Sequence, residues 1–262
     1  MRPITLITGA SAGIGVELAR VFAEHGHELV LVARRETRLA ALADEIATHG
    51  RPRPRVLSAD LAERNAVAEI AAQLTALDLE PEIVVNNAGF GLVGAAATLN
   101  RAEQLAMIDV NVRALTELSL AFVDSLARHR GGILNVASVA AFMPGPGLAV
   151  YYACKAYVLS FTQALHQELS QRGVKATALC PGPVPTEFQA RAGLHAERAQ
   201  SVLFSLSAER VARIGYAGFM RGRRVVVAGL GNRVAVLLVR IAPHRILLPL
   251  LYWGTRFSAR KS

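Results

Sequence analysis

Cysteine is scarce in this chain of 262 residues, and its scarcity excludes several classes of protein. Two cysteines, Cys154 and Cys180, are too few for the disulfide framework of a small secreted domain. Two lone thiols are more often small buried hydrophobic groups than metal ligands, so we expect no metal site. We also expect no signal peptide, because Met1 to Pro3 lead straight into an apolar run. We therefore expect a cytoplasmic protein.

Acidic residues are absent after Glu209. Of the 29 basic residues 11 lie beyond it, which leaves 18 basic against 20 acidic residues in 1–209. A uniformly basic surface would indicate nucleic acid, whereas a neutral body with a basic, apolar end indicates a membrane surface or a protein partner. No nucleic-acid partner is therefore expected.

Long apolar runs are also absent, including from this basic end. Its charge-free stretches are shorter than the ~20 residues of a spanning helix: 225–232, 234–239 and 246–255. Two apolar segments, around Arg233 to Arg240 and from His244 to Trp253, resemble basic amphipathic helices, which suit the inner face of an anionic membrane. They could equally pack on a substrate cleft or form a subunit interface, and the sequence leaves these alternatives open.

What the chain does contain is a regular alternation of short apolar runs with stretches of helical period. This alternation is typical of repeated β-α units, so we predict an α/β fold with one doubly wound parallel sheet of about seven strands and helices on both faces. The expected strands are 3–8, 28–33, 55–58, 82–86, 132–137, 175–180 and 224–228. The expected helices are 13–25, 36–48, 62–76, 101–129, 151–171 and 208–220, the last capped by Ser207.

A glycine-rich turn, Thr8-Gly9-Ala10-Ser11-Ala12-Gly13-Ile14-Gly15, joins the first strand to the first helix. Glycines let the backbone approach a ligand, and the amides at a helix N-terminus face an anion, so phosphate is the natural ligand. The G-x3-G-x-G spacing differs from the commoner dinucleotide spacing. The position of the turn between strand and helix is what supports a nucleotide site.

The second strand ends in Arg34-Arg35, where an acidic residue would normally bind the ribose 2′-hydroxyl of NAD. A guanidinium can instead pair with a 2′-phosphate, so we predict NADP(H) in preference to NAD(H). The alternative is a solvated arginine pair at a helix start. Asp60-Leu61 and Asn86-Asn87-Ala88-Gly89 follow the next two strands and are expected in the same crevice, although Asp60 alone could be only a helix cap.

Tyr151 and Lys155 lie four residues apart on an expected helix, so their side chains share one face. An ammonium beside a phenol stabilises the phenolate, which predicts a tyrosine pKa lowered towards the operating pH of an acid-base catalyst. Lysine occurs only three times, against 26 arginines, and arginine cannot supply a titratable ammonium. Ser138 follows an apolar strand upstream, and Asn111 sits in the long helix before it.

Together these motifs resemble the short-chain dehydrogenase/reductase family over about residues 3 to 190. The resemblance implies a Rossmann-type catalytic domain over 1–222, with 223–262 holding the last strand and the basic extension. It also implies pairing into a homo-oligomer. The expected cofactor contacts are Gly9, Ser11, Gly13, Ile14, Gly15, Arg34, Arg35, Asp60, Leu61, Asn87, Gly89, Tyr151, Lys155, Pro181, Gly182, Val184 and Thr186.

The resemblance further implies a catalytic tetrad for hydride transfer between nicotinamide C4 and a carbonyl carbon. Tyr151 would exchange the proton with the substrate oxygen, and Lys155 would lower the tyrosine pKa and hold the nicotinamide ribose. Ser138 would hydrogen-bond the substrate carbonyl, and Asn111 would hold a water that connects Lys155 to solvent. The loop Pro181–Thr186 would receive the nicotinamide carboxamide.

Apolar residues near these motifs favour a lipophilic ketone or alcohol as substrate, although they could equally be core: Ala140, Ala141, Phe142, Met143, Leu148, Phe188, Leu194, Leu203 and Phe204. Two other functions stay open. One is a catalytically idle NADP(H)-binding or membrane-associated scaffold. The other is an isomerase or dehydratase that uses the same tyrosine and lysine, although the chain after Thr186 leaves little room for the larger substrate domain such enzymes often carry.

Overall fold

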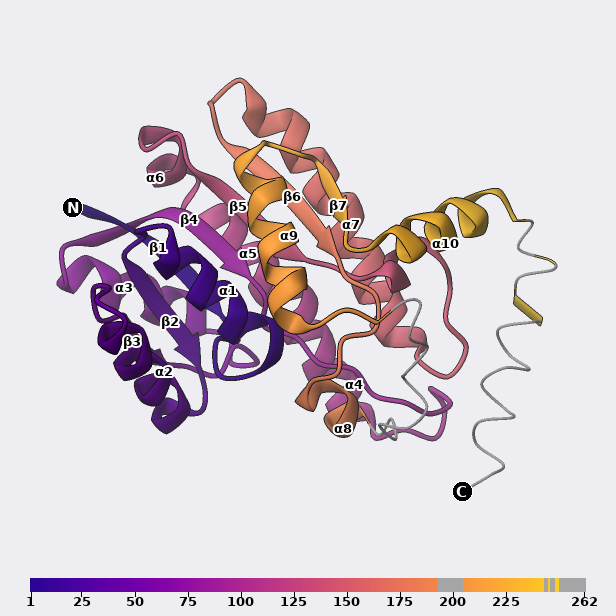
Figure 1. Cartoon of the computed structure of the whole chain (residues 1–262). Helices are drawn as coiled ribbons and strands as arrows, with labels where there is room; N and C mark the ends of the chain where they lie inside the picture. Colours follow the sequence, from indigo (N-terminus) through magenta and orange to yellow (C-terminus); the bar gives the residue numbers. More distant parts are fainter. Residues whose placement is uncertain (193–204, 243–244, 246–247, 250–262) are drawn as a thin grey trace.

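A computed structural model describes residues 1–192, 205–242, 245 and 248–249. Seven parallel strands form one sheet in the order β3-β2-β1-β4-β5-β6-β7 (Figure 1). The strands are β1 (Arg2–Thr8), β2 (Leu29–Ala33), β3 (Arg55–Ser58), β4 (Leu79–Asn86), β5 (Gly132–Val136), β6 (Lys175–Cys180) and β7 (Val225–Val227). The predicted doubly wound sheet is confirmed, because the order reverses between β1 and β4.

Helices cover both faces of the sheet (Figure 1). They are α1 (Gly13–Glu24), α2 (Glu36–Thr48), α3 (Ala66–Ala76), α4 (Arg101–Ile108), α5 (Leu115–Ala121), α6 (Val123–Arg128), α7 (Ala149–Ser170), α8 (Glu187–Ala192), α9 (Ala208–Met220) and α10 (Leu230–Ile241). One apolar core joins α1, α2 and α9 to the sheet, and a second joins α3, α5, α6 and α7 to the other face. Because both faces are covered, the central strands contain near-continuous apolar runs, such as Leu29–Ala33, rather than a strict alternation.

The predicted helix 101–129 is wrong as a single element. It divides into α4, a π-helical turn η1 (Asp109–Ala114), α5 and α6, with Phe122 leaving helical geometry at φ −113° and ψ 12°. The wide turn contains Asn111, whose side chain is bonded to the backbone of Phe90 in another segment. Apolar periodicity carries no sign of such a contact, so the interruption could not be found from the pattern.

Smaller differences concern element ends. The third helix begins at Ala66 rather than residue 62, because Asp60 and its neighbours form turns first. The short helix α8 was not predicted, nor was the 3₁₀ turn η2 (Val139–Phe142). Ser207 does cap α9, because its hydroxyl accepts a hydrogen bond from the amide of Arg210 at 3.2 Å.

The C-terminal part begins with β7 at the sheet edge and continues into α10, which extends away from the sheet (Figure 1). α10 ends at Ile241 because Ala242 is extended, as expected for a residue that precedes proline. None of the helices in the described part of the chain combines the length and apolarity needed to cross a bilayer. Most of the predicted segment 244–253 lies outside the described residues, as do Leu194, Leu203 and Phe204.

Candidate active site

The glycine-rich turn lies where the strand order reverses, between the carboxyl ends of β1 and β4. The Thr8 hydroxyl accepts hydrogen bonds from the amides of Asn87 and Ala88, at 3.1 and 3.2 Å. The side-chain amide of Asn87 donates to the carbonyls of Thr8 and Gly9, at 3.0 and 3.2 Å. Two of the predicted loops are therefore joined into one wall of the crevice in which such sheets bind ligands.

Glycine is required at three positions of this turn, and the structural reason is not the same at each. Gly9 and Gly13 have positive φ angles of 66° and 56°, which side chains other than glycine rarely adopt. A Cβ on Gly15 would lie 2.2 Å from the carbonyl oxygen of Gly9 and 2.4 Å from the Asn87 amide nitrogen. Ser11 and Ile14 lie in the same turn and are partly accessible. The backbone thus forms the close, side-chain-free cradle that a pyrophosphate requires.

Arginine side chains gather at the ends of β2 and α2, beside this cradle. Arg35 donates to the hydroxyl of Ser11 at 3.2 and 3.3 Å and to its carbonyl oxygen at 3.1 Å. Arg34 turns the other way, towards Asp60, at 3.5 Å. The Asp60 carboxylate also accepts from the amide of Ala62 at 3.0 Å, so it acts as a turn cap as well. Leu61 behind it is buried.

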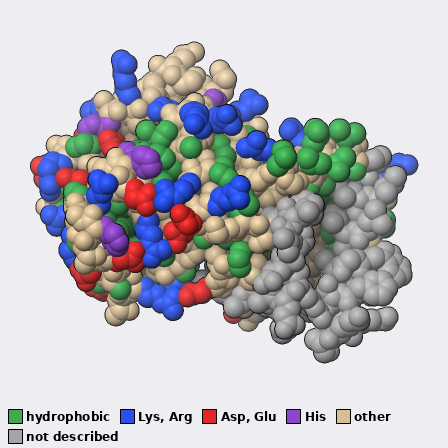
Figure 2. All heavy atoms as spheres, viewed as in Figure 1, with side chains coloured by type: hydrophobic (Ala, Val, Ile, Leu, Met, Phe, Trp, Pro, Cys, Tyr) green, Lys and Arg blue, Asp and Glu red, His purple; other side chains and the backbone are tan. Residues whose placement is uncertain are grey.

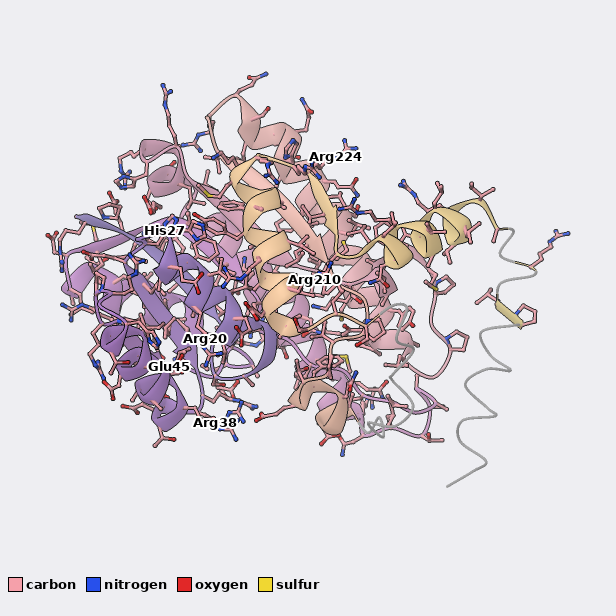
Figure 3. The ribbon with its side chains drawn as sticks, viewed as in Figure 1. Arg20, His27, Arg38, Glu45, Arg210 and Arg224 are labelled. Carbon is pink, nitrogen blue, oxygen red and sulfur yellow. The ribbon has the colours of Figure 1, made fainter. Side chains whose placement is uncertain are left out.

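Two residues that sequence reasoning missed complete this end of the crevice. Arg38, on the first turn of α2 (Figure 3), and Arg35 both bind the carboxylate of Glu187, with Arg35 Nη1 at 2.7 Å from Oε2. A helical spacing of three residues from Arg35 was the available signal for Arg38. The pair already holds an anion between two guanidinium groups, so the residues present fit a 2′-phosphate.

The catalytic residues predicted from spacing are brought together at the other end of the crevice. Tyr151 and Lys155 lie on the first turns of α7, and the Lys155 ammonium is 5.8 Å from the centroid of the Tyr151 ring. Ser138, at the end of β5, hydrogen-bonds the Tyr151 hydroxyl. Lys155 is 5% exposed and donates to the carbonyl oxygen of Val136 at 2.8 Å.

Burial determines the protonation of this pair. Removal from water raises the pKa of Tyr151 to about 12, although its hydrogen bond with Ser138 acts in the opposite direction. The same cause lowers the pKa of Lys155 to about 8. The prediction that Lys155 lowers the tyrosine pKa is therefore wrong for this arrangement. The ammonium is directed to the Val136 carbonyl and lies against the ring, so its charge does not offset the loss of solvent.

Asn111 is fully buried beneath the same pair. Its side-chain amide donates to the carbonyl of Phe90 at 2.9 Å and accepts from the amide of Phe90 at 3.1 Å. A Cβ on Gly89 would lie 2.9 Å from Asn111 Oδ1 and 3.5 Å from Lys155 Nζ. Because Gly89 has no side chain, the loop after β4 can lie close to the side chains of Asn111 and Lys155. Gly89 thus lies beside two of the other predicted site residues.

The loop that follows β6 closes the crevice. The carbonyl of Pro181 accepts from the amide of Val139 at 2.9 Å, which ties this loop to the Ser138 segment. A Cβ on Gly182 would clash with the side chain of Asn232 on α10, at 2.4 Å. Val184 is buried in the core of the α1 face, and Thr186 packs against Gly13 on the opposite bank.

The predicted apolar wall divides into two parts. Ala140 and Ala141 are buried in the core and do not line the crevice. Phe142 and Met143 are partly accessible, and the Phe142 ring lies 5.9 Å from the Arg240 guanidinium of α10. Phe188 stands beside the Tyr151 ring, with a centroid distance of 5.4 Å. An aromatic surface therefore does adjoin the Tyr151 ring.

The fold and the crevice together define a nucleotide-binding oxidoreductase of the Rossmann type. A family model for short chain dehydrogenases matches residues 3–197. The chain belongs to the short-chain dehydrogenase/reductase family and is an oxidoreductase that acts on a CH–OH group or its carbonyl counterpart.

Individual relatives agree with this membership. The chain is 38% identical over 191 residues to sulfoacetaldehyde reductase 2 of Chromohalobacter salexigens, covering 72% of this chain and 75% of that one. A short-chain dehydrogenase from Sphingobium yanoikuyae, solved in complex with NADPH, superposes with a TM-score of 0.80 at 32% identity, covering 90% and 92% of the two chains. The bulky-bulky ketone specific alcohol dehydrogenase from Comamonas testosteroni does so with a TM-score of 0.75 at 29% identity, covering 100% and 92%.

Proposed function

We propose that this protein is an NADP(H)-dependent carbonyl reductase in which Tyr151 is the proton donor. The observation that carries the proposal is the Tyr151 hydroxyl, hydrogen-bonded to Ser138 at the end of β5, with Lys155 buried one helical turn further on. A phenol with a pKa of about 12 stays protonated at neutral pH, which suits a group that gives a proton to a forming alkoxide.

Bound NADPH would supply the hydride, and the protein would supply orientation and electrostatics. Ser138 would bind the carbonyl oxygen of the substrate and place it beside the Tyr151 hydroxyl. Lys155 would hold the nicotinamide ribose, and Asn111 would keep the loop at Phe90 in place and connect Lys155 to solvent through a water. The loop from Pro181 to Thr186 would receive the carboxamide. The glycine turn, Asp60, Leu61 and Asn87 would bind the rest of the dinucleotide.

The preference for NADP(H) is supported by the anion held between Arg35 and Arg38. It is also supported by the NADPH complex of the Sphingobium relative. We expect the parent enzyme to bind NADPH more tightly than NADH, and Arg34→Asp to weaken NADPH while sparing NADH. Equal affinities of the parent for the two dinucleotides, measured by nicotinamide fluorescence, would refute the preference.

The substrate we propose is a lipophilic ketone or aldehyde. Phe188 supports this proposal, because an aromatic side chain beside the proton donor stabilises apolar groups next to the carbonyl. The Comamonas enzyme, a bulky-bulky ketone specific alcohol dehydrogenase, points the same way. A panel of aliphatic, aromatic and polycyclic carbonyls, assayed by NADPH consumption, tests it. Turnover confined to small charged carbonyls would contradict it.

The same panel separates an enzyme from an idle scaffold. A scaffold would bind NADPH and consume none with any carbonyl, whereas the proposed reductase consumes NADPH with at least one. Tyr151→Phe should bind NADPH normally and lose that consumption. Full activity in this variant would show that another group donates the proton.

A second proposal concerns residues 223–262, which we take to dock the enzyme on an anionic membrane surface. The outer face of α10 carries a stripe of exposed apolar side chains, each more than half exposed, that Figure 2 shows gathered at one end of the molecule: Leu230, Val234, Leu237, Leu238 and Ile241. Arg233 and Arg240 flank the stripe, and no acidic residue follows Glu209. This combination of charge and apolar area favours anionic lipid.

The inner face of α10 packs on the protein, through buried Val236 and Asn232, so membrane and cleft contacts use different faces. Flotation with vesicles of anionic or neutral lipid tests the proposal. We expect the parent chain to float with anionic vesicles and the Leu237→Glu/Leu238→Glu variant to remain behind. A parent chain that does not float, but whose dimer is broken by the same substitutions, would assign the stripe to a subunit interface.

We also propose a cytoplasmic homo-oligomer. Exposed apolar residues lie on α4, α5 and α7, and a second copy of the chain would cover them: Leu105, Ile108, Leu120 and Tyr157. Both cysteines are buried and free, which fits a reducing compartment. Sedimentation of the parent and of Leu120→Glu should show an assembly that the substitution weakens.

A further inference from the structure

Glu187 is an acidic residue placed inside the most basic part of the crevice. It is the first residue of α8, which follows β6, yet its partners Arg35 and Arg38 follow β2 on the far bank. One carboxylate oxygen binds each arginine, so the carboxylate occupies one N–H donor group, Nη1, of each guanidinium. All three side chains are between two-fifths and about half exposed.

The segment around Glu187 spans the crevice from the adenosine end to the catalytic end. Thr186 packs against Gly13 of the glycine turn, where a Cβ would lie 3.0 Å from its methyl group. Phe188, on the other side, stands beside the Tyr151 ring at 5.4 Å. The ion pairs of Glu187 with Arg35 and Arg38 therefore hold a segment whose next residue, Phe188, lies beside the Tyr151 ring.

A carboxylate and a phosphate make the same demand on an arginine pair, because both are anions that accept paired N–H donors. They cannot share the same donors, and like charges at that distance repel each other. Ion pairs at exposed sites contribute only about 0–1 kcal/mol, so a phosphate with a greater charge can displace this carboxylate.

Resting on the proposed NADP(H) preference, we propose that Glu187 is an intramolecular competitor of the cofactor 2′-phosphate. The carboxylate holds Arg35 and Arg38 until NADP(H) binds, and then yields them to the phosphate. NADH has a hydroxyl at this position and leaves the pair intact. Glu187 is thus a specificity-determining residue that reduces the affinity for NADPH and leaves the affinity for NADH unchanged.

The test is the pair of dissociation constants for NADPH and NADH, measured in the full-length parent and in Glu187→Gln. We expect the substitution to tighten NADPH by about threefold to tenfold, which corresponds to roughly 0.7–1.4 kcal/mol, and to change NADH by less than about twofold. The matched control is Asp44→Asn, which removes one negative charge from the same side of the protein. Asp44 lies on α2 and pairs with Arg53 at 2.7 Å rather than with Arg35 or Arg38, so this variant should change neither constant.

Three results would overturn the proposed competition. Weaker NADPH binding in Glu187→Gln would show that Glu187 stays closed over the bound cofactor and helps to hold it. Equal tightening of NADPH and NADH, or no change in either, would show that the carboxylate does not compete with the phosphate.

Failure of the cofactor proposal gives a different pattern. It appears in the parent, as equal affinities for NADPH and NADH. Even then Glu187→Gln tests whether the carboxylate competes with the phosphate. A new preference for NADPH in the variant would support the competition, and an unchanged ratio of the two dissociation constants would refute it.

Discussion

The two ends of the crevice hold their functional groups in opposite ways. At the adenosine end, Arg34, Arg35 and Arg38 are roughly half exposed and paired with carboxylates of Asp60 and Glu187. At the catalytic end, Lys155 is 5% exposed, and the hydrogen-bond partners found for it and for Tyr151 are neutral groups, the Val136 carbonyl and the Ser138 hydroxyl.

This difference teaches which property each end can control. Exposed ion pairs are screened and exchange partners at small cost, so the adenosine end can select a cofactor by charge. Buried groups pay a desolvation penalty that shifts their pKa values by two units or more, so the catalytic end controls proton transfer. The predictions below separate the two ends.

The largest effect is expected at the catalytic end, from removal of the phenol oxygen. Tyr151→Phe should lower kcat by about 10²–10⁴-fold, the usual contribution of a general acid, with unchanged NADPH affinity. Steady-state assays and fluorescence titration check both quantities. The control is Tyr157→Phe, which removes a hydroxyl bonded to Thr116 from the same helix and should stay within about twofold. Comparable losses in the two variants would place the effect in the stability of α7.

Lys155 should make stability depend on pH. Its pKa is lowered to about 8, so between this value and the ordinary value of about 10.4 the unfolded chain binds more protons than the folded one. Stability from this group therefore rises with pH, and the cost of burying the ammonium is fully present below pH 8. Lys155→Met lacks this rise.

Urea unfolding of both proteins at pH 7 and at about pH 9.5 measures the effect. Between pH 7 and about pH 9.5, the free energy of unfolding of the parent should rise by roughly 2 kcal/mol more than that of Lys155→Met. The upper pH stays below the ordinary pKa of tyrosine, about 10, so Tyr151 does not contribute. A constant difference between the two proteins would mean that Lys155 is not desolvated.

The glycine cradle between the two ends should tolerate no side chain. Gly15→Ala would place a Cβ against the backbone of Gly9, which cannot rotate away, so we expect a loss of stability of about 1–3 kcal/mol and of cofactor binding. Gly26→Ala has open space around it and a φ of 85°, and should lose about 1 kcal/mol without affecting the cofactor. Thermal unfolding with and without NADPH distinguishes these outcomes. Normal cofactor binding by Gly15→Ala would contradict the proposal that the glycine turn binds the pyrophosphate of the cofactor.

The smallest effect is expected at the exposed adenosine end. Arg35→Ala should weaken NADPH by about tenfold, a loss of about 1.4 kcal/mol, and leave NADH nearly unchanged. Arg34→Ala should weaken NADPH less, because Arg34 points to Asp60 and away from the arginine pair. A greater loss from Arg34→Ala would reverse the assignment of the two neighbouring residues.

Much of this molecule could be predicted from its sequence, because buried parallel strands and strand-to-helix turns have strong local patterns. Strands β3 and β6 were predicted to the residue, and the others to within three residues at either end. Tyr151, Lys155 and Ser138 come together as their positions after strands and on one helix face required.

The features that could not be predicted from the sequence depend on contacts between segments that are distant along the chain. The break at Asn111 accompanies its bonds to Phe90, and Glu187 reaches Arg35 over 152 residues of chain. The raised pKa of Tyr151 depends on how far the surrounding fold shields the phenol from water, which a four-residue spacing cannot reveal.

The most direct test of the central claim follows the hydride and the proton in one experiment. NADPH carrying deuterium at both C4 positions of the nicotinamide is mixed with the parent enzyme and a carbonyl substrate identified by the panel. We predict an alcohol with deuterium on its carbinol carbon, and at least about a hundredfold less of this product in the same time from Tyr151→Phe with NADPH still bound. Product without deuterium from the parent, or equal product from the two proteins, would contradict reduction by Tyr151-assisted hydride transfer.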